Sequence, residues 1–246
     1  MKKTLVIANW KANIESLKEV TNFILEIKKK TQKNQEFILC APFVFAAAIK
    51  SKGVTLGAQD VSNVTRGSHT GEVTAKMLKS VGVQYCIVGH SERRKRGETD
   101  QMVSEKVKNL LKGKITPILC IGEKIRGLNG EHFEEISNML LSSLKDVPKA
   151  SLASIVVTYE PVWAISTEKN GATDPETVRE AIIFIKKVLT DHLGKKIASK
   201  VKVIYGGSVD PKNVREIKNV GTAEGFLIGK ASLNPKSFLQ ISENLK

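Results

Sequence analysis

Eight short, uninterrupted apolar runs constrain the fold of this chain more than any other feature. Each run is rich in aliphatic and β-branched residues and lacks the alternation of apolar and polar residues that marks a strand with one wet face. Continuous runs of this kind are typical of parallel strands that are buried on both faces. They occupy residues 4–8, 36–41, 54–59, 84–89, 115–121, 154–160, 201–207 and 225–229.

Amphipathic helix patterns lie between these runs. Apolar side chains recur at helical spacing over residues 14–27, and we expect Asn13 to be the N-cap of that helix. The same spacing recurs over 133–144 and 178–189, the latter behind Asp174-Pro175, an N-cap residue followed by a proline suited to the first helical position.

Strands that alternate with helices imply a parallel α/β sheet. A chain of 246 residues with eight such units has the size of a closed (β/α)8 barrel, also called a TIM barrel. The alternative is an open, doubly wound sheet, but no Gly-x-Gly-x-x-Gly follows the first run as a dinucleotide site would require. We therefore predict a single barrel domain over residues 1–246.

Composition and cysteine usage favour a cytoplasmic protein. No apolar run approaches the roughly 18 residues needed to cross a bilayer. The N-terminus is basic and then apolar, but its apolar stretch is shorter than the apolar region of a signal peptide. Cys40, Cys86 and Cys120 lie far apart, each on or near an apolar run. This spacing predicts reduced thiols in the core and fits neither a zinc site nor a disulfide framework.

The chain carries 39 Lys and Arg against 25 Asp and Glu, a formal charge of +14. One interpretation is a surface that binds nucleic acid or an anionic membrane. The other is an enzyme with lysine-rich helices whose field attracts an anionic substrate. Aromatic residues make up only 5% and do not interleave with the lysines, so we favour the second and expect no nucleic-acid or membrane partner. Nucleic-acid binding stays open as an additional role.

Polar residues gather where the apolar runs end, which is where a (β/α)8 barrel places its chemistry. Taken singly, each has an ordinary explanation as a turn former, a helix cap or a surface charge. Together they predict one site at the mouth of the barrel, built from Asn9, Lys11, His90, Ser91, Glu92, Arg93, Glu160, Gly206, Gly207, Ser208, Gly229 and Lys230.

Within this set Glu160, His90 and Lys11 offer a carboxylate, an imidazole and an ammonium group beside two glycine-containing turns. Backbone N–H groups in such turns commonly hold phosphate. A carboxylate base together with an uncharged imidazole suits proton transfer at a carbon next to a carbonyl. Clustered metal ligands are missing from the sequence pattern, so we expect no metal or cofactor.

Six motifs resemble those of the triosephosphate isomerase family, in order and across nearly the whole chain: NWKAN, VGHSERR, CIGE, YEPVWAI, YGGSV and GFLIGKASL. The resemblance implies interconversion of dihydroxyacetone phosphate and D-glyceraldehyde 3-phosphate through an enediolate, in glycolysis and gluconeogenesis. Glu160 matches the family's general base, and His90 matches its neutral electrophile. Lys11 matches its fixed cation, with Asn9 beside it.

The resemblance also implies supporting residues and a partner. Glu92 matches a carboxylate that supports the catalytic lysine, and Ser91 lies beside it in the same motif. The segment 62–72 resembles the family's interdigitating loop, in which Thr70 would reach a second subunit near its Asn9. A homodimer is therefore expected.

In this family a lid and two turns hold the substrate phosphate through backbone N–H groups, which here belong to Ser166, Ser208, Gly229 and Lys230. Ser166, Glu168 and Lys230 stand where the family usually has glycine, so a phosphosugar-binding barrel with impaired turnover is the alternative function. The lid implied by the resemblance comprises Pro161, Val162, Trp163, Ala164, Ile165, Ser166, Thr167 and Glu168.

Overall fold

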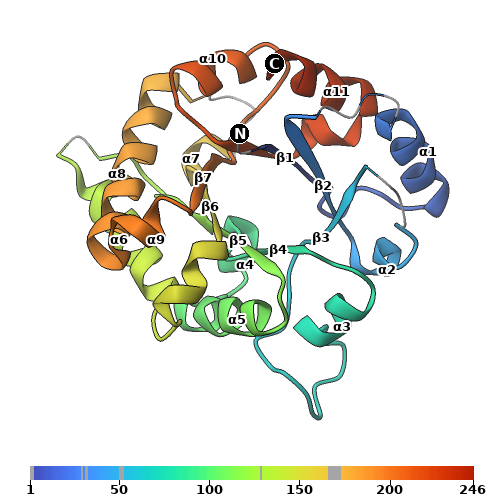
Figure 1. Cartoon of the computed structure of the whole chain (residues 1–246), viewed down its shortest axis with the longest axis horizontal. Coiled ribbons are helices and arrows are strands. Elements are labelled where there is room, and N and C mark those ends of the chain that lie inside the picture. Colours follow the sequence, from blue (N-terminus) through green and yellow to red (C-terminus); the bar gives the residue numbers. More distant parts are fainter. Residues whose placement is uncertain (1–2, 29, 31–32, 50–52, 128, 166–172) are drawn as a thin grey trace.

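The computed structural model describes residues 3–28, 30, 33–49, 53–127, 129–165 and 173–246. Eight parallel strands pair in sequence order, and the last pairs with the first to close a barrel (Figure 1), which confirms the predicted fold. The strands are β1 Thr4–Asn9, β2 Gln35–Ala41, β3 Thr55–Ala58, β4 Tyr85–Val88, β5 Thr116–Ile121, β6 Val156–Tyr159, β7 Lys202–Tyr205 and β8 Gly225–Ile228.

Helices surround the barrel and cover its outer face (Figure 1). The predicted segments 133–144 and 178–189 are helical, and Asp174 caps the second by accepting a hydrogen bond from the backbone N–H of Thr177. The α-helices are α1 Leu17–Lys28, α2 Phe43–Ala46, α3 Ala75–Ser80, α4 Ser91–Arg94, α5 Asp100–Lys112, α6 Glu131–Ser143, α7 Val162–Ile165, α8 Pro175–Leu193, α9 Lys195–Ala198, α10 Val214–Asn219 and α11 Pro235–Asn244, with 3₁₀ turns η1 Lys149–Ser154 and η2 Lys230–Leu233.

The prediction that Asn13 caps the first helix is wrong. Helix α1 begins at Leu17, and its start is held by Ser16 and Glu19. The Ser16 hydroxyl accepts from the backbone N–H of Glu19 at 3.3 Å, and the Glu19 carboxylate accepts from the backbone N–H of Ser16 at the same distance. This reciprocal pair satisfies two N–H groups that the helix itself leaves without acceptors. Asn13 instead donates from its amide to the carbonyl of Trp10.

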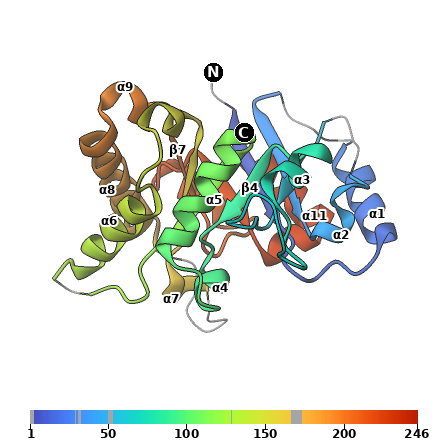
Figure 2. The same ribbon diagram turned by 90° about the horizontal axis from the view of Figure 1, so that it is seen from below.

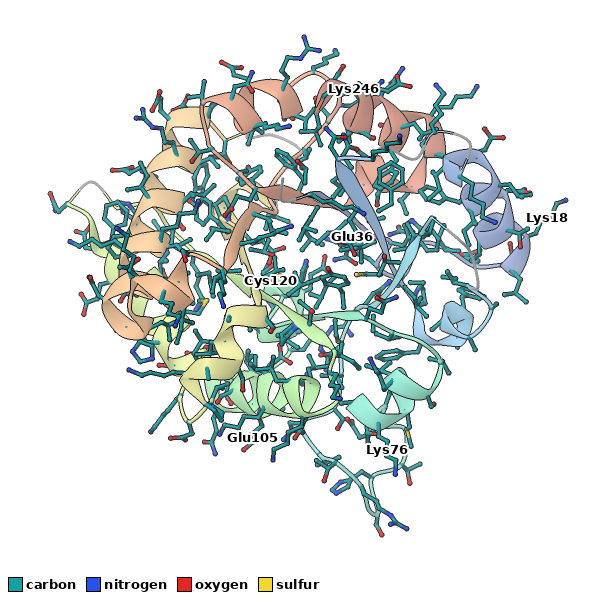
Figure 3. The ribbon with its side chains drawn as sticks, viewed as in Figure 1. Lys18, Glu36, Lys76, Glu105, Cys120 and Lys246 are labelled. Atoms are coloured by element: carbon teal, nitrogen blue, oxygen red, sulfur yellow. The ribbon has the colours of Figure 1, made fainter. Side chains whose placement is uncertain are left out.

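Alternate residues of most strands belong to two separate apolar clusters. In β1, Leu5 and Ile7 belong to the cluster inside the barrel, whereas Val6 and Ala8 belong to the layer between barrel and helices. Both faces of the strand are therefore dry, which is why the apolar runs in the sequence are uninterrupted. Figure 3 shows Cys120 in the central part of the molecule and Lys18 on the outer rim.

All three cysteines are buried and unpaired, as predicted. Burial raises the pKa of the Cys40, Cys86 and Cys120 thiols well above the usual range. In the part of the chain that the structure describes, no helix combines the length and apolarity needed to cross a bilayer.

Candidate active site

The short helices α4 and α7 follow directly after β4 and β6, so they mark the carboxyl ends of the strands. Figure 2 shows α4 and α7 together at the lower edge of the molecule. A cavity of about 410 Å³ opens at the α4 and α7 end, lined by Asn9, Lys11, His90 and Glu160 and by the turns 206–209 and 229–231. Asn9 and Glu160, 151 positions apart in sequence, thus line one cavity.

Glu160 follows the last residue of β6 and is only 3% exposed. One carboxylate oxygen, Oε1, lies 2.8 Å from His90 Nε2, and the other, Oε2, accepts from the backbone N–H of Ser91 at 3.2 Å. The Glu160 backbone N–H donates to the carbonyl of Ile121 at the end of β5. A buried carboxylate is therefore fixed in position by two neighbouring strands and by the start of α4.

The hydrogen bonds of His90 specify its uncharged form. Its Nδ1 accepts from the backbone N–H of Glu92 at 3.2 Å, so this nitrogen carries the lone pair. In a neutral imidazole the proton then resides on Nε2, the nitrogen that faces Glu160. The start of α4 thereby orients a neutral N–H donor into the cavity.

Lys11 adopts a left-handed backbone conformation, with a φ of 51°, which is uncommon for a residue other than glycine. Its backbone N–H donates to Asn9 Oδ1, and its carbonyl accepts from the Gln59 amide. Its ammonium group lies 2.6 Å from Glu92 Oε1. Partial burial raises the pKa of Glu92, but the hydrogen bond and charge of Lys11 outweigh it and hold that pKa below its usual value.

Sequence reasoning missed Gly122, the residue after β5. A Cβ on Gly122 would lie 2.0 Å from the carbonyl oxygen of Glu160 and 2.5 Å from its carbonyl carbon. Only a residue without a side chain allows the backbone of Glu160 to come this close to β5. Gly122 lies within the motif CIGE at the end of a predicted strand, which is the signal that points to it.

Glu123 was missed as well, and it anchors the beginning of the segment predicted as a lid. Its side chain is fully buried and accepts from the Tyr159 hydroxyl at 2.9 Å and from Trp163 Nε1 at 2.8 Å. Burial, reinforced by the Glu123 charge, raises the pKa of Tyr159. The Val162 backbone N–H donates to the Glu123 carbonyl. The described lid residues, Pro161 to Ile165, are thus attached to the end of β5.

Ser166, Thr167 and Glu168, the rest of the predicted lid, lie outside the described residues. The two turns that are predicted to bind phosphate are described. Ser208 donates from its hydroxyl to the Ala164 carbonyl at 3.2 Å, which joins the turn after β7 to α7. Lys230 begins η2 directly after Gly229, and its backbone lies outside the left-handed region that favours glycine.

Thr70 is exposed on the loop between β3 and α3, which projects away from the barrel (Figure 1). Neither Ser91 nor Glu92 lines the cavity; both act on residues that do, through the contacts given above. Among the side chains that the structure describes, no group of three or more His, Cys, Asp or Glu residues is arranged to hold a metal ion.

Comparison with known proteins relates this site to one family. The family model for triosephosphate isomerase matches residues 4–245. The triosephosphate isomerase of Alkaliphilus oremlandii is 37% identical over 98% of this chain and 99% of the relative. Those of Thermus thermophilus and Flavobacterium johnsoniae are each 40% identical, over 98% of both chains. The chain therefore belongs to the triosephosphate isomerase family.

Proposed function

We propose that this protein interconverts dihydroxyacetone phosphate and D-glyceraldehyde 3-phosphate by proton transfer through an enediolate. The observation that carries the proposal is the contact between a buried carboxylate, Glu160, and a neutral imidazole, His90, in a cavity that Lys11 and Asn9 also line. Family membership supplies the substrate, and the geometry supports the roles of the residues.

The proposed reaction begins with removal of a proton from C1 of the ketose by the Glu160 carboxylate. His90 Nε2–H donates to the carbonyl oxygen at C2, which gains negative charge as the enediolate forms. The Lys11 ammonium group stabilises the same charge. Return of the proton to C2, together with transfer of the hydroxyl proton from O1 to O2, leaves a carbonyl at C1 and a hydroxyl at C2 and completes the aldose without net gain or loss of protons.

The hydrogen bonds that Glu160 makes in the structure are consistent with these reaction steps. The carboxylate accepts hydrogen bonds from His90 Nε2–H and from the Ser91 backbone N–H. A bound carbonyl substrate takes over the His90 donor, which leaves the carboxylate available as a base. We assign Ser91 and Glu92 to positioning: Ser91 acts on Glu160, and Glu92 acts on Lys11 and His90.

A coupled isomerase assay tests the proposal. Removal of the base in Glu160→Gln and its retraction in Glu160→Asp are expected to lower kcat by at least about 100-fold, because the base must lie within hydrogen-bond reach of the proton. The control is Glu134→Gln, which removes an exposed carboxylate on α6 and is expected to keep wild-type turnover. Near-normal turnover in Glu160→Asp contradicts the assigned role. Substrate binding by a wild-type protein that does not turn over supports the phosphosugar-binding alternative.

We also propose that the protein is a cytoplasmic homodimer. Helices α2 and α3, on either side of β3 and the loop that carries Thr70, have exposed apolar side chains: Val44 is 80% exposed and Met77 is 55% exposed. Exposed apolar side chains that form a contiguous patch mark protein–protein contacts. Sedimentation velocity is expected to show a dimer that Thr70→Arg dissociates. Leu25→Glu, at an equally prominent apolar residue on α1, is the control and is expected to remain dimeric.

A further inference from the structure

Among the residues that the structure describes, the charges that line the active-site cavity balance one another. Two acidic residues, Glu160 and Asp210, and two lysines, Lys11 and Lys230, line it, and His90 is neutral. Removal of either lysine would leave the lining with net negative charge. A phosphate dianion would then enter against a repulsive field.

The two lysines differ in how they are attached to the cavity. Lys11 is engaged by Glu92 at 2.6 Å, so part of its charge is already compensated by a carboxylate outside the lining. Lys230 begins η2, beside the turn that contains Ser208 and Asp210. Of the two cations, Lys230 is therefore the one attached to the turns that we propose hold the phosphate.

The Asp210 carboxylate would repel a phosphate at this end of the cavity unless a nearby cation offset its charge. Its Oδ1 accepts from the backbone N–H groups of Lys212 and Asn213 at 2.7 Å and 3.0 Å, which fixes the carboxylate at the rim of the cavity. The Lys11 side chain also approaches this end, since its Cε would lie 3.8 Å from a Cβ placed on Gly229. An anion placed at the turns thus meets one fixed carboxylate and two cations.

We propose that the Lys230 ammonium group is a phosphate-binding group of this protein, which offsets Asp210 and adds an ion pair to the contacts made by the backbone of the turns. This inference rests on the function proposed above, and it names a side chain that contributes to recognition of the phosphate. It predicts that binding of phosphate depends on Lys230 and weakens with ionic strength more steeply than backbone contacts alone would allow.

Inorganic phosphate is the probe, because its binding requires no turnover. Isothermal titration calorimetry at pH 7.5 is expected to show that Lys230→Ala raises the Kd for phosphate about five- to tenfold at low salt, since a partly exposed ion pair contributes modestly. Lys230→Arg is expected to restore most of the affinity. The control, Lys236→Ala, removes an exposed lysine six positions away on α11 and is expected to leave the Kd unchanged.

Kinetics and salt provide the second measurement. Lys230→Ala is expected to raise KM about five- to tenfold, like the Kd, while kcat changes less than about twofold. This pattern is expected because the contact with the phosphate is present in both the ground state and the transition state. The difference in Kd between the wild type and this variant is expected to shrink at 0.5 M KCl.

An unchanged phosphate Kd in Lys230→Ala overturns the inference, and so does an equal loss in Lys236→Ala, which would reflect only the general field of the protein. A wild-type protein that binds phosphate through Lys230 but lacks isomerase activity would refute the proposed function and leave this inference intact.

Discussion

Gly122 lies so close to the Glu160 backbone that we expect a side chain at this position to displace Glu160, although Gly122 is assigned no contact with the substrate. Real Cβ atoms essentially never lie within 3.0 Å of a heavy atom of a residue that is not their chain neighbour. A Cβ on Gly122 would lie 2.0 Å from the Glu160 carbonyl oxygen. Gly122→Ala must therefore move the Glu160 backbone by about 1 Å. The φ of Gly122 is not in the left-handed region, so this contact, and not backbone strain, is the obstacle to a side chain.

The displacement falls on the group that we propose as the base. The Glu160 backbone N–H donates a hydrogen bond to the carbonyl of Ile121, the residue before Gly122. Insertion of the methyl group is therefore expected to push the ends of β5 and β6 apart. A misplacement of about 1 Å at a reacting group costs roughly 100-fold in rate. This corresponds to about 2.7 kcal/mol of lost transition-state stabilisation. We therefore expect kcat/KM of Gly122→Ala to fall about 100-fold.

The coupled assay measures this loss, and circular dichroism establishes that the variant is folded, because an added methyl in a packed region destabilises by about 1–3 kcal/mol. Gly113→Ala is the matched control. Gly113 also has an ordinary φ of −76°, and its Cβ would approach no closer than 3.3 Å to a neighbour, at the C-terminal end of α5. A folded Gly122→Ala variant within threefold of wild-type kcat/KM would refute the argument that this glycine positions Glu160.

Two further predictions concern stability and pH. Ser16→Ala removes the cap of α1 and is expected to lower the free energy of unfolding by about 1 kcal/mol in urea denaturation, whereas an unchanged midpoint would mean that the capping hydrogen bonds contribute nothing. Glu92 has a pKa lowered by Lys11, so its contribution to stability is present above the usual glutamate pKa and is lost as pH falls through the lowered value. The difference in Tm between wild type and Glu92→Gln is therefore expected to be small at pH 7 and to vanish in acid; a difference that grows on acidification would contradict this sign.

Much of the fold follows from local patterns in the sequence. The strands are recognisable because residues such as Leu5 and Val6 are both buried, on opposite faces of one strand, which leaves no polar position in the run. The start of α8 is recognisable because Asp174 and Pro175 have conformational preferences of their own. The start of α1 was misplaced because Asn13 and Ser16 are both good caps, and only packing decides which one the helix uses.

The candidate site divides in the same way. Asn9, Lys11, His90 and Glu160 were identified by their places at strand ends and by their motifs, since a parallel barrel brings all such ends to one mouth. The tautomer of His90 depends on the Glu92 backbone N–H. The anchoring of the predicted lid depends on the hydrogen bond from Trp163 to Glu123, 40 residues away. Neither contact can be predicted from the local sequence around one of its two partners.

The amino-acid sequence by itself determined the order of strands and helices, the burial of both strand faces and the kinds of chemical group at the barrel mouth, because these follow from the preferences of neighbouring residues. Only the tertiary structure decided that Lys11 pairs with Glu92 across 81 residues, that Glu160 rests on His90, and that Gly122 leaves room for both strands. The physical reason is closure of the barrel: it turns distant strand ends into neighbours, and the distances between them are set by packing of the whole ring.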